Sequence, residues 1–239
     1  MLALARFACP GQVSVMSRRA LSEKRPFLLL AIAFAVAYWV LRATSFPEFY
    51  LVPVKGLATA MLATYAFVRF PGKDGRLLGM ALICAALGDM AMEIDTTVGG
   101  ALFFLFHVLM LGLFVKFRRE RMAGSQKALV LILLVLTPVI AFLLPAERIW
   151  AMQTAFYGLA LGAMTAAAWA SRFPRYRVGA GAVLFWFSDM LIFARMGPLE
   201  NSLLAREAVY PIYFIGMIMV CTGVVQSLRR WKSESRLRT

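Results

Sequence analysis

Two aspartates, Asp89 and Asp189, lie inside stretches of the chain that are otherwise apolar. A charge inside a membrane span costs at least about 2.5–3.5 kcal/mol on insertion scales, so each carboxylate is a candidate functional group. Two carboxylates that share a low-dielectric site cannot both ionise easily, and such a pair supplies one acid and one base. The sequence therefore predicts acid–base chemistry by Asp89 and Asp189.

The two aspartates have related surroundings, offset by 100 residues. Gly88-Asp89-Met90 follows Gly79, and Ser188-Asp189-Met190 follows Gly179. Small residues near each aspartate allow neighbouring helices to approach closely. We therefore expect the two carboxylates to lie at one depth in similar packing, with Ser188 as a further candidate residue of the site.

Other polar residues interrupt the apolar stretches at a similar depth. At a rise of about 1.5 Å per residue, Lys55, His107 and Tyr213 join both aspartates about 7–12 Å below one membrane surface. Random placement would scatter them, so we predict one polar cavity in that half of a helical bundle. Glu93 and Tyr210 are further members of the group.

Each of these residues also has a purely structural alternative. Lys55 and Glu93 would reach the interface or form an ion pair between two helices. His107 would be a hydrogen-bonded core histidine, and the two tyrosines would belong to an interfacial aromatic belt. The two aspartates are harder to explain in this way, because a short carboxylate cannot reach the interface.

Membrane-spanning helices must position these residues. The chain of 239 residues is 62% hydrophobic and 16% charged, with a mean hydropathy of +0.75, and a soluble domain of this size cannot bury so much apolar surface. The apolar stretches are continuous rather than alternating, which excludes a β-barrel. The predicted fold class is an all-α integral membrane bundle of about eight transmembrane helices, near residues 26–42, 50–68, 77–94, 99–117, 128–145, 149–170, 178–196 and 208–228.

The net charge of +14 is distributed unevenly along the chain. Of the 26 Lys and Arg residues, 21 flank one side of the predicted spans, whereas Arg42, Arg148, Arg195 and Arg206 flank the other side and Lys55 lies within a span. This asymmetry predicts cytoplasmic N- and C-termini in a multi-pass protein, of the inner membrane in a bacterium, and excludes a nucleic-acid partner.

Three regions follow from this topology. Residues 1–25 form a cytoplasmic N-terminal segment, residues 26–228 a single transmembrane domain, and residues 229–239 a basic cytoplasmic tail. Met16 directly precedes Arg18-Arg19, which makes it an alternative start and residues 1–15 a candidate untranslated segment.

From about residue 26 to residue 228 the chain resembles the YhhN-like lysoplasmalogenase family of eight-span membrane proteins. The resemblance rests on short motifs around the polar residues: Val54-Lys55-Gly56, Ala86-Leu87-Gly88-Asp89-Met90, Phe106-His107, the segment from Gly181 to Leu191 with its Phe-x-x-Ser-Asp-x-x-Leu pattern, and Tyr210 to Tyr213. Two positions differ from the family pattern. Gly56 stands where the family has proline, and Met217 stands where it has glutamine.

The resemblance implies hydrolysis of the vinyl ether bond of lysoplasmalogens, which releases a fatty aldehyde and a glycerophospho-headgroup without a metal or another cofactor. Asp89 and Asp189 would act as the acid–base pair, and Lys55 would bind the lipid phosphate. His107, Tyr210 and Tyr213 would bind substrate or orient water. The expected partners are the lysolipid and the surrounding membrane lipids.

Two other kinds of function remain open at this point. A proton-coupled transporter also uses buried carboxylates with a lysine and a histidine, and a lipid-binding membrane protein would need no activity. An intramembrane aspartyl protease is disfavoured because Ala86 breaks the Gly-x-Gly-Asp motif. A zinc hydrolase with several histidine ligands is excluded because the chain has one histidine.

Overall fold

The computed structural model describes residues 26–237, and this part of the chain forms eight α-helices. They are α2 (Pro26–Leu41), α3 (Glu48–Arg69), α4 (Lys73–Ala91), α5 (Thr96–Lys116), α6 (Gly124–Leu143), α7 (Ala151–Ala170), α8 (Ala180–Arg195) and α9 (Leu203–Arg236). A 3₁₀ turn (Arg148–Trp150) precedes α7, and a π-helical turn (Arg175–Gly179) leads into α8. The predicted all-α class is confirmed.

Each of these helices coincides with one predicted span, and most ends agree within a few residues. The largest difference is at α9, which continues past the predicted end at residue 228 to Arg236. On its exposed last turns Arg230 donates a hydrogen bond to Glu234 at 2.9 Å, an i,i+4 pair that supports a helix in water. The predictions for residues 1–25 lie outside the described residues.

Among the described helices, five are both long and apolar enough to cross a membrane: α3, α5, α6, α8 with its π-helical turn, and α9. The apolar α2 has 16 residues. Glycine and alanine are frequent in α4 and α7, and about half of the residues in each are buried against other helices. Small residues suit helices that face protein rather than lipid. The chain is therefore a multi-pass membrane protein.

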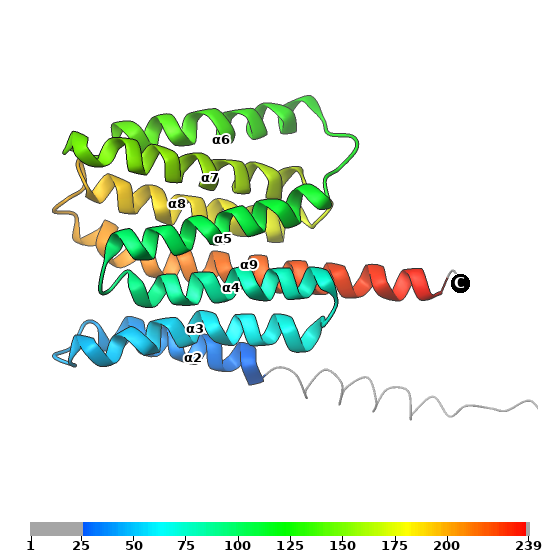
Figure 1. Cartoon of the computed structure of the whole chain (residues 1–239), viewed down its shortest axis with the longest axis horizontal. Coiled ribbons are helices and arrows are strands. Elements are labelled where there is room, and N and C mark those ends of the chain that lie inside the picture. The colour runs from blue at the N-terminus through cyan, green and yellow to red at the C-terminus, as the bar shows by residue number, and fades with distance from the viewer. Residues whose placement is uncertain (1–25, 238–239) are drawn as a thin grey trace, which may run out of the picture.

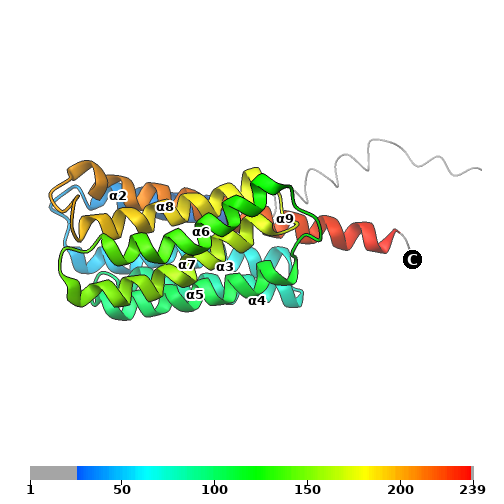
Figure 2. The ribbon, with the colours of Figure 1, turned by 90° about the horizontal axis from the view of Figure 1, so that it is seen from above.

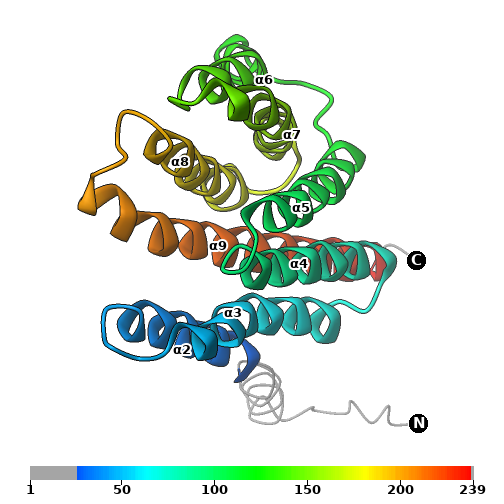
Figure 3. The ribbon, with the colours of Figure 1, turned by 60° about the vertical axis from the view of Figure 1, so that its left-hand side comes forward.

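The helices lie roughly along one axis of an elongated bundle (Figures 1 and 2). Except for α5 and α6, helices that are neighbours in sequence pack together, and α5 packs against α7, which joins the two halves of the chain. Figure 3 shows α2 and α3 along one edge, α6 and α7 along the opposite edge, and α9 between them. Because α9 contacts α2, α3, α4 and α8, residues from both halves meet along it.

The contact between α8 and α9 depends on two glycines. A Cβ atom added to Gly181 would lie 2.9 Å from the carbonyl oxygen of Gly216, and one added to Gly216 would lie 2.7 Å from that of Gly181. Real Cβ atoms do not approach backbone oxygens so closely, so the two helices are packed backbone against backbone. This contact fixes Asp189 of α8 relative to Tyr213 of α9.

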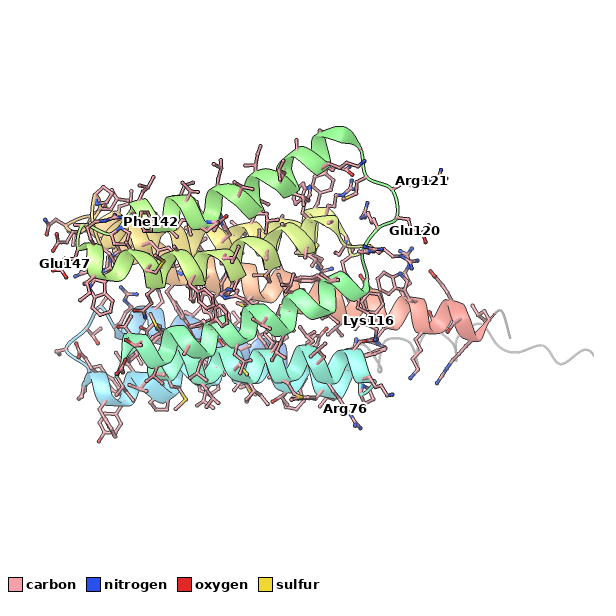
Figure 4. The ribbon with its side chains drawn as sticks, turned by 45° about the horizontal axis from the view of Figure 1, so that its top comes forward. Arg76, Lys116, Glu120, Arg121, Phe142 and Glu147 are labelled. Atoms are coloured by element: carbon pink, nitrogen blue, oxygen red, sulfur yellow. The ribbon has the colours of Figure 1, made fainter. Side chains whose placement is uncertain are left out.

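The two ends of the bundle differ in charge. Arg76, Lys116 and Arg121 lie at one end, together with Glu120, whereas Glu147 lies at the opposite end (Figure 4). We call the end with Arg76, Lys116 and Arg121 the basic end. The α3–α4, α5–α6 and α7–α8 connections lie at this end and carry most of the positive charges among the described residues. The last turns of α9 extend beyond the other helices on the same side (Figure 1).

Candidate active site

A cavity of about 1280 Å³ lies at the end of the bundle opposite the basic end. Its lining extends from the connection between α2 and α3 to Asp89 of α4 and Asp189 of α8, which are 2% and 5% exposed. Small-molecule pockets in proteins have volumes of about 300–1,000 Å³. This cavity therefore has room for the headgroup and the first part of the chain of a single-chain lipid.

Asp89 lies in a hydrogen-bonded cluster between α3, α4 and α9. Its Oδ2 accepts hydrogen bonds from the hydroxyl of Thr59 at 2.5 Å and from that of Tyr213 at 2.8 Å. The two hydroxyls are 3.3 Å apart. Hydrogen bonds from neutral donors favour the ionised form of a carboxylate, so this cluster suits a negative charge.

Lys55 of α3 and Glu93, in the turn that follows α4, form the neighbouring contact. The Lys55 Nζ atom lies 2.6 Å from Glu93 Oε1, which also accepts a hydrogen bond from Tyr38 at 3.0 Å. Lys55 precedes Thr59 by four residues and Glu93 follows Asp89 by four, so the two contacts are one helical turn apart on the facing sides of α3 and α4. The ion pair between helices is the structural alternative considered for Lys55, and its role in phosphate binding stays a prediction.

Asp189 lies in more aromatic surroundings. Its Oδ2 accepts a hydrogen bond from Tyr157 of α7 at 2.8 Å. The hydroxyl of Ser188 donates to the Phe185 carbonyl at 2.7 Å and lies 3.4 Å from Asp189 Oδ1. Asp189 thus has one close hydroxyl donor, and Ser188 is mainly engaged with the backbone.

His107 of α5 is completely buried beside Asp189. Its Nε2 atom lies 4.0 Å from Asp189 Oδ2, and neither ring nitrogen has a hydrogen-bond partner in the described part of the chain. The rings of Tyr157 and Phe185 pack edge-on against it at centroid distances of 5.0 and 5.3 Å. His107 is therefore placed behind Asp189, outside the cavity lining.

Tyr213 connects the two carboxylates. Its hydroxyl binds Asp89, while its ring packs against Phe185 at a centroid distance of 5.4 Å, and Phe185 in turn contacts His107 beside Asp189. Tyr210, one turn earlier on α9, packs against Tyr38 at 4.5 Å, and its buried hydroxyl has no partner among the described residues.

The structure gathers nearly all the candidate residues of the sequence at this one cavity. Its lining includes Lys55, Asp89, Glu93, Ser188, Asp189, Tyr210 and Tyr213. These residues come from α3, α4, α8 and α9 and from the turn that follows α4. Their chemical roles stay predictions.

Thr59 and Tyr157, which bind the two carboxylates, were not identified from the sequence. Tyr157 lies about eight residues into its predicted span from the cavity end, the depth at which the other candidates lie. Including every tyrosine at that depth would have found it. Thr59 offers a weaker signal, because a threonine within a helix often bonds its own backbone instead.

No group of three or more His, Cys, Asp or Glu side chains that could hold a metal ion is found among residues 26–237. The polar side chains that line the cavity include carboxylates, phenol and alcohol hydroxyls, an amide and a few cationic groups. Carboxylates and hydroxyls at hydrogen-bonding distance can exchange protons with a bound substrate.

Comparison with known proteins gives one result, a match of residues 50–224 to the model of the YhhN family. The chain belongs to the YhhN family. No curated protein and no solved structure matches it. The matched range extends from the start of α3 into α9, so it includes Lys55, both aspartates and Tyr213.

Gly56 and Met217, the two positions at which the sequence differs from the pattern expected from the resemblance, lie outside the cavity lining. A Cβ atom on Gly56 would lie 2.7 Å from the sulfur of Met90 and 3.1 Å from the carbonyl oxygen of Ala86, so Gly56 serves the contact between α3 and α4. Met217 is 1% exposed and belongs to the hydrophobic core. Both positions therefore affect helix packing more directly than contact with a bound molecule.

Proposed function

We propose that this YhhN protein is a membrane-embedded hydrolase that cleaves the vinyl ether bond of lysoplasmalogen-type lysolipids to a fatty aldehyde and a glycerophospho-headgroup. The observation that supports it best is the pair of buried carboxylates, Asp89 and Asp189, on one cavity that is large enough for a lysolipid. Each carboxylate accepts a hydrogen bond from a tyrosine at 2.8 Å. This resembles the division of labour between two carboxyl groups in glycosidases.

The proposed reaction begins with proton transfer from one carboxylic acid to the β-carbon of the vinyl ether. The double-bond electrons form the new C–H bond, and the α-carbon becomes an oxocarbenium ion that the other, ionised carboxylate stabilises. Water then adds to the α-carbon and gives up a proton to a carboxylate. The hemiacetal collapses, the C–O bond to glycerol breaks, and the glycerol oxygen takes a proton as the aldehyde leaves.

We assign the stabilising, ionised role to Asp89 and the proton donor role to Asp189. Asp89 receives two hydroxyl donors, Thr59 and Tyr213, on one oxygen, an arrangement that favours a negative charge. Asp189 has one close hydroxyl donor, Tyr157, a more distant one, Ser188 at 3.4 Å, and the buried ring of His107 beside it. A neutral carboxylic acid fits such an environment better than a second anion does.

The test is lipid mass spectrometry of the purified protein with lysoplasmenyl and lysoacyl lipids of the same headgroup and chain. We expect aldehyde from the lysoplasmenyl lipid alone. In D₂O the aldehyde should carry one deuterium at C2, because the first step protonates that carbon. A folded, monodisperse protein that releases no aldehyde would reject the proposal. Substrate-driven proton uptake into proteoliposomes would then favour the transporter.

The proposed topology has eight spans with both termini in the cytoplasm. It is supported by the eight described helices and by the collection of positive charge at the basic end, the side to which α9 also extends. The membrane would be the inner one in a bacterium. Reporter fusions after residue 228 should indicate the cytoplasm, and fusions near Thr97 should indicate the opposite side. An external C-terminus would contradict this orientation.

A further inference from the structure

Within the part of the chain that the structure describes, four cationic side chains line the cavity, and three of them have partners. Lys55 pairs with Glu93 at 2.6 Å, and both Arg42 and Arg206 pair with Glu207, at 3.3 and 3.1 Å. These ion pairs compensate part of the positive charge in the cavity. The fourth cation is Arg195.

The side chain of Arg195 makes no hydrogen bond, ion pair or ring contact with any residue that the structure describes. Its Nε atom is nevertheless shielded from solvent. An arginine that is partly desolvated without an acceptor is unfavourable unless something else supplies one. A bound anion would do so, since the planar guanidinium binds two oxygens of a phosphate side by side.

The distribution of charge along the chain supports a ligand-binding role. Among residues 26–237, four arginines flank the spans at this end of the bundle, and three of these four line the cavity. Positive charge is otherwise concentrated at the basic end. The few cations at the cavity end are therefore placed at the cavity rather than spread over that surface.

We propose that Arg195 binds the phosphate of the lysolipid headgroup, an inference that rests on the proposed function. Arg195 follows Asp189 by six residues on α8, or about 9 Å along the helix axis. In a lysoplasmalogen, seven bonds separate the β-carbon of the vinyl ether from the phosphorus, and an extended chain of that length spans about 8 Å. One molecule can therefore place its vinyl ether at Asp189 and its phosphate at Arg195.

A purely structural role is the alternative. Arg195 is the last residue of α8, and a cation at a helix C-terminus interacts favourably with the helix dipole. This role predicts that replacing Arg195 lowers thermal stability but does not change the preference for phosphorylated ligands. The two roles are therefore separated by a measurement of ligand preference.

The experiment measures binding, so that it does not depend on hydrolysis. The ligand is a 1-alkyl lysophospholipid with a saturated ether, which keeps the phosphate and the chain but lacks the reactive double bond. The 1-alkylglycerol of the same chain serves as the comparison without phosphate. Intrinsic tryptophan fluorescence reports binding in detergent, because Trp150 lines the cavity.

We expect Arg195→Gln to weaken binding of the phospholipid by about tenfold or more while leaving binding of the alkylglycerol within about twofold. Arg195→Lys should weaken phospholipid binding to an intermediate degree, because lysine keeps the positive charge but lacks the planar group that binds two phosphate oxygens. Arg69→Gln is the matched control, since Arg69 ends α3 at the basic end and also has a buried, unpartnered Nε. That variant should bind both ligands like the wild type.

Three outcomes would overturn the proposal. The first is equal affinity of the wild type for both ligands, which needs no variant and holds even if Arg195→Gln fails to fold. The second is a folded Arg195→Gln or Arg195→Lys variant that keeps the full preference for the phospholipid. The third is competition by inorganic phosphate at the same concentration as the lipid, which would assign Arg195 to free phosphate. If Arg195→Gln selectively loses phospholipid binding but the wild type hydrolyses no lysoplasmenyl lipid, the result would reject the proposed reaction and keep the phosphate site at Arg195.

Discussion

The surroundings of Asp89 and Asp189 differ in chemistry although the two carboxylates share one cavity. Asp89 lies among hydroxyls, with Thr59 and Tyr213 on the same oxygen and the Lys55–Glu93 ion pair one helical turn away. Asp189 accepts one close hydrogen bond, from Tyr157, and lies beside the ring of His107, which packs in turn against Phe185. Similar sequences thus place two carboxylates in one polar and one aromatic environment.

The difference shows how a pair of identical side chains can be given two roles. Hydrogen-bond donors that point at a carboxylate oxygen stabilise its negative charge, whereas neighbouring aromatic rings do not. The inequality comes mainly from neighbouring helices: α3 and α9 supply the hydroxyls to Asp89, whereas α5 and α7 supply the rings beside Asp189. The proposed acid and base are therefore distinguished by tertiary packing rather than by local sequence.

The largest effects are expected from removing either carboxylate. Asp89→Asn and Asp189→Asn should each reduce kcat for aldehyde release by about 10²–10⁴-fold, because each variant loses one half of an acid–base pair. The double variant should be little worse than either single one, since residues that act as a unit are not additive. The measurement is the rate of aldehyde release from a lysoplasmenyl lipid.

These variants require proof of folding, because removing a buried hydrogen-bonded group can itself unfold a protein. Monodisperse elution and an unchanged helical circular dichroism spectrum provide it. Folded single variants with turnover near that of the wild type would reject the catalytic pair. Additive losses in the double variant would mean that the two aspartates act independently.

The second prediction tests the contrast between the two tyrosine hydrogen bonds. A hydrogen bond to a charged group contributes about 1.5–3 kcal/mol and one between neutral groups about 0.5–1.5 kcal/mol. If Asp89 is the ion, Tyr213→Phe should lower kcat by about 10–100-fold and Tyr157→Phe by about 2–10-fold.

Tyr210→Phe is the matched control for these variants. It removes a tyrosine hydroxyl from the same helix and cavity, but this hydroxyl has no hydrogen-bond partner among the described residues. We expect kcat within about twofold of the wild type, whereas the predicted contact of Tyr210 with the substrate would change KM. If Tyr157→Phe is more damaging than Tyr213→Phe, the roles of the two aspartates are exchanged.

The helices were predictable because lipid imposes a simple requirement, a run of about 20 apolar residues for each span. The end of α9 was not predictable in this way. The apolar stretch ends at residue 228, whereas the helix continues in water to Arg236 through charged residues. Depth along each helix predicted that Lys55, both aspartates and Tyr213 gather at one level. Depth does not give the rotation of a helix about its axis, which is why Thr59 and Tyr157 were missed and why His107 lies behind the cavity lining.

The smallest effect is expected at the ion pair beside Asp89. Lys55 and Glu93 carry opposite charges and act on Asp89 in opposite directions, so that Glu93 offsets only part of the larger effect of Lys55. Lys55→Gln would leave Glu93 as an uncompensated negative charge close to the carboxylate. We expect kcat to fall by about three- to tenfold and KM for the lysolipid to stay within about twofold, because the phosphate is assigned to Arg195.

The double variant Lys55→Gln/Glu93→Gln shows whether charge balance is the reason. Removing both charges also removes the uncompensated negative charge next to Asp89, so kcat should recover part of the loss caused by Lys55→Gln even though the ion pair is lost. Steady-state kinetics of both variants and of Arg195→Gln, on one lysoplasmenyl lipid, provide the comparison. A rise in KM for Lys55→Gln with unchanged kcat would show that the ammonium leaves Glu93 and binds the phosphate, because a contact made equally in the ground and transition states changes binding alone. The polar surroundings of Asp89 would then include the headgroup site, and the assignment of the phosphate to Arg195 on α8 would be wrong.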